Sequence, residues 1–293
     1  MERRHSAAQS EDIFGAMPNV VILAGPNGAG KTSAAPVLLR GEFRVREFVN
    51  ADVIARGLSG FSPDAMAVEA GRIMLRRLEG LALAQHDFAF ETTLSGIAVL
   101  HALERWRSAG YVIRIVYLWL ASADVAVTRV RARVHQGGHS VPDDVIRRRY
   151  ERGLVNFATR YRVVADQWQL YDNTDPLDRR PVANGERETI TVVDGDRWRE
   201  FQRAVAATSR IREVLMTDRP PLPDDHLTRA FRDPAVMERA MRITHARVIR
   251  RHRLLNQPLV VSQNGEVAYL DPHTVPMPEG VTEEEMGPVF DYL

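Results

Sequence analysis

The sequence predicts an α/β protein with a mostly parallel sheet flanked by helices. Apolar and β-branched runs recur between residues 18 and 175, and segments with apolar residues at helical spacing separate them. The first run, 19–24, leads directly into a glycine-rich loop and then into a segment compatible with a helix. Alternating strands and helices favour a parallel sheet with helices on both faces.

The elements follow in order. Residues 19–24 are continuously apolar, as in a buried strand, and 33–39 can form a helix if Pro36 lies in its first turns. The strongest strand signal is 111–120, which is rich in Val, Ile and Tyr. The remaining predicted strands are 47–50, 88–90 and 168–173, and the predicted helices are 64–84, 97–108, 122–134 and 142–166.

The pattern changes after residue 173. Residues 174–188 are predicted to be a loop, 189–193 a short strand, and the following segment an amphipathic helix to about 215. The proline-rich stretch 219–225 predicts a linker. Beyond it, 234–254 predicts an arginine-rich helix and 259–270 a hairpin that turns at Asn264-Gly265. We therefore expect a polar lead-in (1–17), a main domain (18–217), and a linker with a small helix-plus-hairpin module (218–293).

Length and composition narrow the class of protein. A chain of 293 residues suits one large domain with or without an appendage. The absence of cysteine excludes disulfides and thiolate chemistry. No apolar run reaches the ~18 residues of a membrane span, and residues 1–16 lack the apolar core of a signal peptide. We expect a cytoplasmic protein with no membrane partner. Nucleic acid is not an expected partner, because the net charge is +1 and no aromatic residues interleave a basic stretch.

The glycine-rich loop carries the sharpest motif. Residues 25–32 read Gly-Pro-Asn-Gly-Ala-Gly-Lys-Thr and complete the phosphate-binding pattern G-x-x-x-x-G-K-[ST]. Lys31 is the only lysine among 39 basic residues, and it stands where a compact ammonium can sit between phosphates. Thr32 is expected to hold Mg²⁺. The expected ATP-binding residues are Gly25, Pro26, Asn27, Gly28, Ala29, Gly30, Lys31, Thr32 and Ser33.

Polar residues follow two other predicted strands. Open α/β sheets bind ligands at the carboxyl ends of their strands. Asp52 could accept a proton from a substrate hydroxyl or cap the next helix. Glu91 could bind a sugar hydroxyl or join the Mg²⁺ shell, and the threonines after it could contact substrate or cap a helix. The expected substrate-side residues are Asn50, Asp52, Glu91, Thr92, Thr93 and His139.

Arginines suggest a lid over the phosphates. Arg129 and Arg133 share a helix face just before a Gly-Gly-His segment that ends at His139. Such arginines could stabilise a transferring phosphoryl group, although a solvated basic face is the commoner use of a charge run. Most of the run 147–149 is expected at the surface.

Together these residues resemble the zeta-toxin family of P-loop kinases. The resemblance covers about 18–175 and rests on residues 25–32, 50–55, 70–72, 88–95, 110–111, 129–134, 137–142, 148–150 and 172–173. It implies ATP-dependent phosphorylation of a sugar hydroxyl in UDP-N-acetylglucosamine by the toxin of a toxin–antitoxin system. It implies that Asp52 is the catalytic base, that Lys31 and Thr32 are the nucleotide and Mg²⁺ ligands, and that Glu91 and Thr92 lie on the substrate side. The best-known members carry two lid arginines in a longer insertion, whereas here the segment is short and reads Gly-Gly-His. Arg133 is the first candidate for the catalytic lid arginine, and Arg129 is the second.

Residues 218–293 lie outside this resemblance and look similar to small proteins often encoded beside such toxins. They could act as an antitoxin in cis, or simply complete the fold, and an antitoxin could also act in trans. Two other functions stay open: a kinase of a different hydroxyl, such as that of a dinucleotide, an antibiotic or an RNA 5′ end, and a nucleotide-gated binding protein without transfer.

Overall fold

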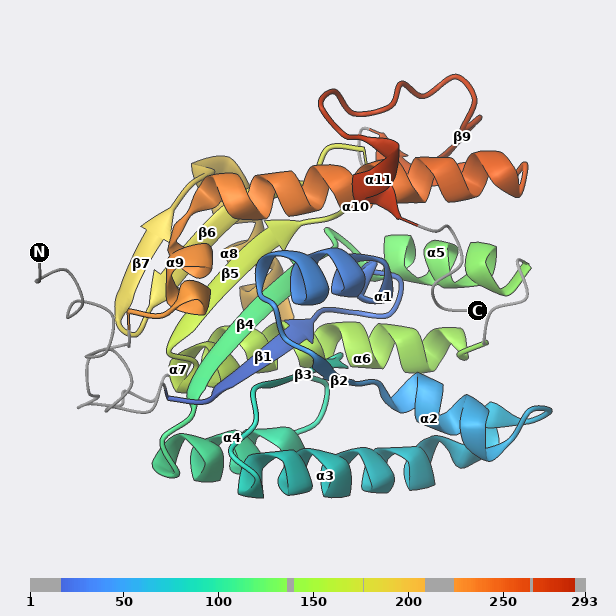
Figure 1. The fold of residues 1–293 in the computed structure, drawn as a ribbon. Helices are drawn as coiled ribbons and strands as arrows, with labels where there is room; N and C mark the ends of the chain where they lie inside the picture. The colour runs from blue at the N-terminus through green and yellow to red at the C-terminus, as the bar shows by residue number, and fades with distance from the viewer. Residues whose placement is uncertain (1–16, 136–139, 176, 209–223, 264–265, 288–293) are drawn as a thin grey trace, which may run out of the picture.

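The computed structural model describes residues 17–135, 140–175, 177–208, 224–263 and 266–287. A seven-stranded sheet with the order β2-β3-β1-β4-β5-β6-β7 forms its centre. Helices cover both faces, with α3 and α4 on one side and α10 on the other (Figure 1). Within the described part of the chain, no helix combines the length and apolarity needed to cross a membrane.

The first five strands are parallel, and the last two are antiparallel. The parallel strands are β1 (Asn19–Ala24), β2 (Glu47–Val49), β3 (Phe88–Thr92), β4 (Val112–Trp119) and β5 (Gln167–Asp172). The antiparallel strands are β6 (Arg180–Glu186) and β7 (Thr189–Val192). Every residue of β1, β4 and β5 is buried, as continuous apolar runs require in a sheet covered on both faces. The predicted α/β class with a mostly parallel sheet is confirmed.

Helices connect these strands, and all of them except α2 correspond to predicted helical segments. They are α1 (Lys31–Ala35) with its π-helical continuation Pro36–Glu42, α2 (Ala51–Leu58), a 3₁₀ turn (Pro63–Met66) before α3 (Ala67–Leu83), α4 (Ala98–Ser108), α5 (Ala123–His135), α6 (Asp143–Asn156) and α8 (Gly195–Thr208). The predicted helix 142–166 continues from α6 through a π-helical segment, Phe157–Tyr161, into α7 (Arg162–Val164).

The region predicted as a loop at 174–188 contains strand β6, so that prediction was wrong. The segment is polar and loop-like in composition, but tertiary packing overrides this. Gly185 lies directly against the indole ring of Trp168 on β5, where a Cβ atom would collide with the ring. Pro181 falls beside a register shift between β5 and β6. Gly185 therefore allows close packing and Pro181 lies at a bulge, and neither residue reverses the chain.

The C-terminal segment has two short helices that were not predicted from the sequence, α9 and α11. Helix α9 (His226–Arg232) precedes α10 (Pro234–Leu254), β8 (Leu259–Gln263), β9 (Glu266–Leu270) and α11 (Glu283–Met286). Asp225 caps α9, because its carboxylate accepts a hydrogen bond from the backbone N–H of Thr228 at 2.6 Å. The predicted helix and the two strands of the predicted hairpin are present, while the Asn264-Gly265 turn lies outside the described residues.

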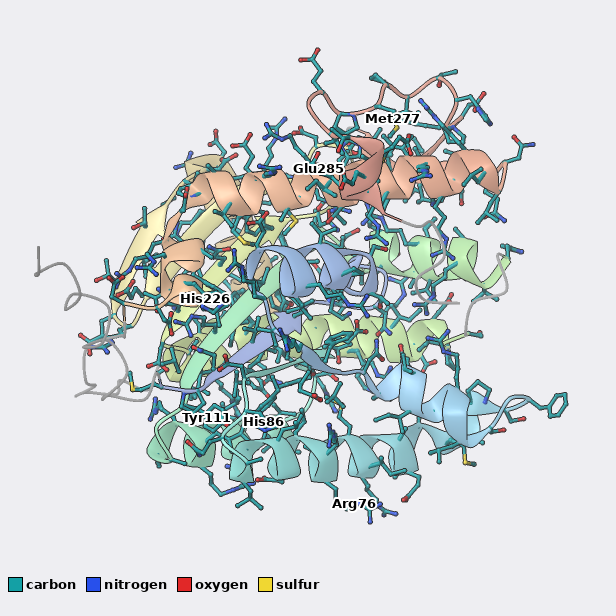
Figure 2. All side chains as sticks on the ribbon, in the orientation of Figure 1. Arg76, His86, Tyr111, His226, Met277 and Glu285 are labelled. Carbon is teal, nitrogen blue, oxygen red and sulfur yellow. The ribbon has the colours of Figure 1, made fainter. Side chains whose placement is uncertain are left out.

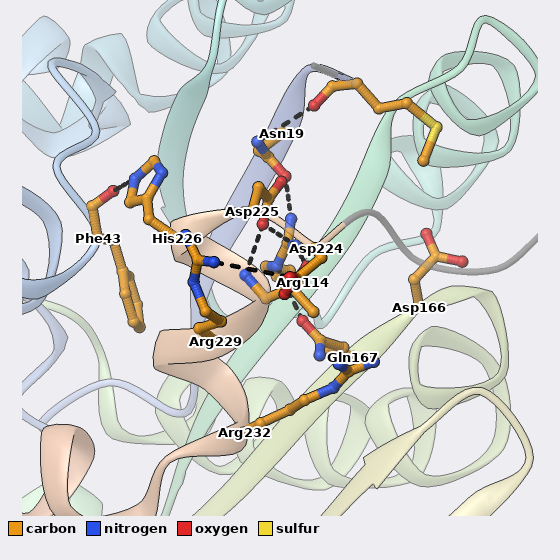
Figure 3. Close-up of polar contacts among 12 residues, drawn as sticks. Asn19, Phe43, Arg114, Asp166, Gln167, Asp224, Asp225, His226, Arg229 and Arg232 are labelled. Carbon is orange, nitrogen blue, oxygen red and sulfur yellow. Dashed lines mark hydrogen bonds and ion pairs between the residues drawn. The ribbon is translucent and has the colours of Figure 1, made fainter. Parts of the chain in front are cut away.

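Buried polar contacts join α9 to the central sheet (Figure 3). The guanidinium of Arg114 on β4 is fully buried and forms an ion pair with Asp225 at 3.1 Å. It also donates to Thr228, Asn19 and Gln167. These contacts fix the start of the C-terminal segment against the amino-terminal ends of the central strands β1, β4 and β5.

Apolar packing continues this attachment along α10. The ring of Phe231 stacks on that of Phe43 with centroids 4.8 Å apart, and the carbonyl of Phe231 accepts a hydrogen bond from Gln169. Residues of α9 and α10 belong to the same hydrophobic core as the sheet: Leu227, Ala230, Phe231, Met237, Ala240, Met241 and Ile243. The domain boundary near 218 stays a prediction, but the segment beyond it shares one core with the sheet.

Smaller contacts hold the two ends of the molecule. Tyr111, at the start of β4, donates its hydroxyl to the carbonyl of His86 at 3.0 Å, and the two residues lie together in Figure 2. Near the opposite end, Glu285 on α11 pairs with Arg239 on α10. The last short helix thereby packs against α10.

Candidate active site

The loop between β1 and α1 has the conformation that its glycines permit. Gly28 and Gly30 have φ angles of 78° and 79°, in the left-handed region that favours glycine. A Cβ atom on Gly30 would lie 3.0 Å from the side-chain nitrogen of Asn173, which follows β5. The side chain of Asn173 in turn donates to the carbonyl of Ala29 at 2.5 Å. The end of β5 therefore holds the loop in place.

Lys31 begins α1 and is buried beneath this loop. Its Nζ donates to the carbonyls of Gly25 and Pro26 at 2.9 and 3.0 Å. Burial lowers the pKa of the Lys31 ammonium, and the carboxylates of Glu91 and Asp52 oppose that change. The ammonium thus lies between two backbone carbonyls on one side and two acids on the other.

Glu91 lies beside Thr32 at the end of β3. The hydroxyl of Thr32 donates to Glu91 Oε2 at 3.0 Å. Burial raises the pKa of Glu91, while Lys31 acts in the opposite direction. A hydroxyl and a carboxylate at this distance form a hard oxygen set that suits Mg²⁺, which binds few protein ligands and completes its shell with phosphates and water. Among the described residues, no group of three or more His, Cys, Asp or Glu could hold a metal without such help.

Asp52 lies in the first turn of α2 and does not cap it. The cap is Asn50, whose side-chain oxygen accepts from the backbone N–H groups of Asp52 and Val53 at 2.7 and 3.3 Å. This arrangement leaves the Asp52 carboxylate exposed along the same cavity as Lys31 and Glu91. Of the two uses considered for Asp52 from the sequence, helix capping belongs to its neighbour.

Two arginines from neighbouring helices approach the phosphate loop. Arg133 on α5 and Arg149 on α6 line the cavity, and both positive charges favour a lower pKa for Lys31. Arg148 is exposed, in line with the expected surface position, whereas Arg149 is half-buried. Arg149 was not predicted as a site residue, because a run of three arginines on a helix does not show which one faces inward.

Arg129 has a different setting. Its two Nη atoms donate to the carbonyls of Asn173 and Thr174, each at 2.8 Å. Burial lowers the pKa of Arg129 to about 10, and Asp175 and Asp172 act in the opposite direction. Arg129 therefore links α5 to the segment after β5. The positive charge of Arg133, by contrast, acts on the pKa values of Lys31 and Glu91.

Most of the other predicted residues line the cavity, and three form the backbone frame of the phosphate loop. Asn27, Gly28, Gly30, Lys31, Thr32 and Ser33 line the cavity with Asn50, Asp52, Glu91, Thr92 and Thr93, whereas Gly25, Pro26 and Ala29 form the frame of the loop. The Thr92 hydroxyl accepts from the backbone N–H of Leu94 at 3.1 Å, and that of Thr93 is 2.9 Å from the hydroxyl of Ser95. His139 lies outside the described residues.

One cavity of about 700 Å³ joins these groups. Its first compartment extends from the phosphate loop toward α2 and α3, where Gly71, Met74 and Leu75 line it. Its second extends toward α10 and β8, where Arg251 and Leu259 line it. Helices α2 and α10 lie on opposite sides of α1 in Figure 1. The volume lies within the usual range of a small-molecule site.

Comparison with known proteins agrees with this geometry. No protein-family profile matches the chain. A chain in the structure of the AvrRxo1-ORF1:AvrRxo1-ORF2 complex with sulphate ions is 16% identical, with a TM-score of 0.51 over 79% of this chain and 76% of that chain. A chain of the same complex with ATP is also 16% identical, with a TM-score of 0.51 over 64% of each chain. The chain therefore shares the α/β fold of these structures, and the predicted fold class is confirmed. A likeness at this identity shows the fold alone.

Two further similarities complete the comparison. A chain from the PezAT toxin–antitoxin system of Streptococcus pneumoniae is 14% identical, with a TM-score of 0.47 over 67% of this chain and 91% of that chain. An uncharacterized protein of Haemophilus influenzae is 27% identical over 131 residues, which are 44% of this chain and 91% of that protein.

Proposed function

We propose that this protein is an ATP-dependent kinase of zeta-toxin type, which transfers the γ-phosphoryl group of ATP to a sugar hydroxyl of a nucleotide sugar. One observation carries the proposal: Lys31, Asp52 and Glu91 line a single cavity, between the phosphate-binding loop and the end of that cavity lined by α3. Phosphoryl transfer needs positioning and charge stabilisation more than covalent chemistry, and this arrangement supplies both.

The groups take distinct parts in the proposed reaction. The loop and Lys31 bind the phosphates of the donor, and the ammonium exchanges its bonds with the carbonyls of Gly25 and Pro26 for phosphate oxygens. Asp52 accepts the proton of the acceptor hydroxyl as that oxygen attacks the γ-phosphorus. Arg133 and Arg149 stabilise the charge that develops on the transferred group.

Thr32 and Glu91 are the residues that would hold Mg²⁺. Bound there, the ion would neutralise charge on the β- and γ-phosphates. The Thr32 hydroxyl is 3.0 Å from Glu91, and burial raises the pKa of Glu91. Both observations fit a carboxylate that would be neutralised by a cation arriving with the nucleotide.

The charge of the cavity supports an acceptor that carries its own phosphates. Among the described residues that line it, nine are Lys or Arg and two are Asp or Glu. ATP alone offers about four negative charges, so a diphosphate acceptor such as UDP-N-acetylglucosamine fits the excess better than a neutral sugar or antibiotic. Apolar side chains of α3, such as Met74 and Leu75, offer a surface for the uncharged parts of that acceptor.

The test is ADP release by the purified protein with Mg-ATP, in the presence and absence of UDP-N-acetylglucosamine, with mass spectrometry of the products. A mass increase of one phosphoryl group on the sugar nucleotide would establish both the reaction and the acceptor. ATP binding without a phosphorylated sugar nucleotide would overturn this acceptor. Dinucleotides, aminoglycosides and RNA 5′ ends then follow as acceptors in the same assay. No turnover with any of them would favour a nucleotide-gated binding protein.

Replacing the proposed base tests the mechanism. We expect Asp52→Asn to retain ATP binding and to lower the transfer rate at least ~10²-fold, because the amide cannot accept the proton. Asp143→Asn on α6 is the matched control, because its carboxylate pairs with Arg131 on the protein surface. Steady-state kinetics measure both variants. A rate within a few-fold of the wild type for Asp52→Asn would remove Asp52 from this role.

An antitoxin is the partner that accompanies the zeta-toxin proposal, and it could act in trans or through residues 218–293 in cis. Expression of the wild type and of Asp52→Asn in a bacterial host tests toxicity. If the protein is a toxin held in check, growth inhibition should depend on Asp52 and should increase when the inhibitor is absent.

A further inference from the structure

The C-terminal segment reaches the cavity at the end opposite to the acceptor compartment. Helix α10 packs against α1 and the π-helical segment after it, and β8 packs against α5. Through these contacts Val248, Arg251, Leu259 and Val260 become part of the cavity wall. A segment that follows the kinase motifs by more than 70 residues thus closes the space beside the phosphate loop.

This wall is built into the fold. The ion pair between Arg114 and Asp225, the stacking of Phe231 on Phe43 and the burial of Met237 anchor α9 and α10 to the sheet. These anchors lie in α9 and the first half of α10. Val248 and Leu259 of the wall belong to a second, smaller apolar cluster around Ile249, and β8 is held by its packing against α5. We therefore treat α10 and β8 as a fixed side of the cavity.

The polar groups of the wall suit a ligand that accepts hydrogen bonds. The Nε atom of Arg251 is buried without a hydrogen-bond partner among the described residues. Arg179 nearby has an unpartnered, buried Nε as well, and burial together with Arg129 lowers the pKa of Arg179 to about 9. An ideal Cβ on Gly30 would lie 3.9 Å from Arg179 Nη2, so this second arginine borders the phosphate loop.

The shape of the wall identifies which part of the ligand it faces. The phosphate loop binds the β- and γ-phosphates, and the acceptor must approach from the side of Asp52 and Glu91. The nucleoside of the donor therefore extends the other way, toward α10. Val248, Leu259 and Val260 offer apolar surface there, and the planar guanidinium of Arg251 can stack on a base or donate to its edge.

We propose that α10 and β8 form the binding wall for the nucleoside of ATP, with Arg251 as its main polar contact. The C-terminal segment then belongs to the donor site and supports nucleotide binding. This inference rests on the proposed ATP-dependent function. It differs from inhibition in cis, in which the same segment would exclude ATP. Loss of a side chain from the segment should weaken ATP binding under our proposal and strengthen it under inhibition.

The experiment is isothermal titration of the full-length protein with Mg-ATP and, separately, with inorganic tripolyphosphate. Arg251→Ala should weaken ATP binding about tenfold or more, as expected for loss of a charged hydrogen-bond donor, and should leave tripolyphosphate binding unchanged. Arg242→Ala is the matched control, because Arg242 is exposed on the same helix and contacts only Glu238 among the described residues. It should change neither affinity.

Two further variants distinguish a loss of nucleoside binding from a loss of phosphate binding or of the fold. Lys31→Ala should weaken both ligands, because the lysine serves the phosphates. Arg251→Gln, which keeps side-chain length, should reproduce the effect of Arg251→Ala, and circular dichroism verifies that both are folded. ATP binding by either variant that equals or exceeds that of the wild type would overturn the inference, and tighter binding would favour the inhibitory cover. A wild type that binds tripolyphosphate but not ATP would overturn the inference and the proposed function together.

Discussion

At the scale of single residues, the site depends on where charged side chains are buried. The place of Lys31 in the cavity could be predicted from the sequence, because the phosphate-loop pattern specifies its last two positions. The contact between Thr32 and Glu91 could not, since it joins residues 59 apart through the parallel pairing of β1 with β3. The sequence located both partners at element ends, and only the fold brings them together.

Arg149 gives a prediction at this scale. We expect Arg149→Ala to lower the transfer rate by about 10- to 10²-fold, because a positive charge that stabilises the proposed transition state is lost. Arg148→Ala is the matched control, since it removes a neighbouring arginine that is exposed. Steady-state kinetics should show the loss mainly in kcat. Equal transfer rates for Arg149→Ala and Arg148→Ala would show that Arg149 takes no part in the transfer.

At the scale of elements, periodicity predicted helices better than composition predicted loops. The spacing of apolar residues gave α10 its observed bounds, 234–254. Strand β6 was missed because its segment is polar and loop-like in composition, and the reason for Pro181 and Gly185 lies in the neighbouring strand. Helix α9 was missed because seven residues after a proline-rich stretch carry too short a pattern. The contacts that join these elements to the sheet are not contained in the local sequence, although the Asp225 cap of α9 is.

Helix α10 also carries a buried histidine, which predicts a pH dependence of stability. Burial and the nearby charge of Arg179 lower the pKa of His245 from 6.5 to about 4. Between these values the unfolded chain binds a proton that the folded chain does not, so stability falls as the pH falls through this window. From pH 7 to pH 5 we expect His245 to account for a loss of about 1–2 kcal/mol in the free energy of unfolding.

Urea denaturation at the two pH values measures this loss. His245→Gln should reduce the difference between pH 7 and pH 5 by that amount, whatever its effect on stability at pH 7. His273→Gln is the control, because His273 is exposed. The same pH difference in wild type and His245→Gln would mean that His245 is protonated in the folded protein.

At the scale of the whole molecule, the C-terminal segment is where sequence and structure differ most. Its composition suggested a separate module after a linker, and patterns within a segment cannot show what it packs against. In the structure, its helices share one core with the sheet and its arginines share one cavity with the phosphate loop. Attachment and function are therefore linked: whatever loosens α9 from the sheet also displaces the wall that α10 forms.

The attachment itself can be measured through Asp225. Its carboxylate pairs with Arg114, whose side chain is fully buried, while its own side chain is 13% exposed. Removing one partner of such a pair leaves a buried charge uncompensated, so we expect Asp225→Ala to lower the free energy of unfolding by about 3–5 kcal/mol. The neighbouring Asp224 is 78% exposed and 3.6 Å from Arg229, and Asp224→Ala should cost less than about 1 kcal/mol. Urea denaturation followed by tryptophan fluorescence compares the two, since all four tryptophans lie in the part of the chain before residue 218. If Asp225→Ala unfolds at the same urea concentration as Asp224→Ala, the C-terminal segment does not stabilise the sheet, and it would then be a separate module as its composition suggested.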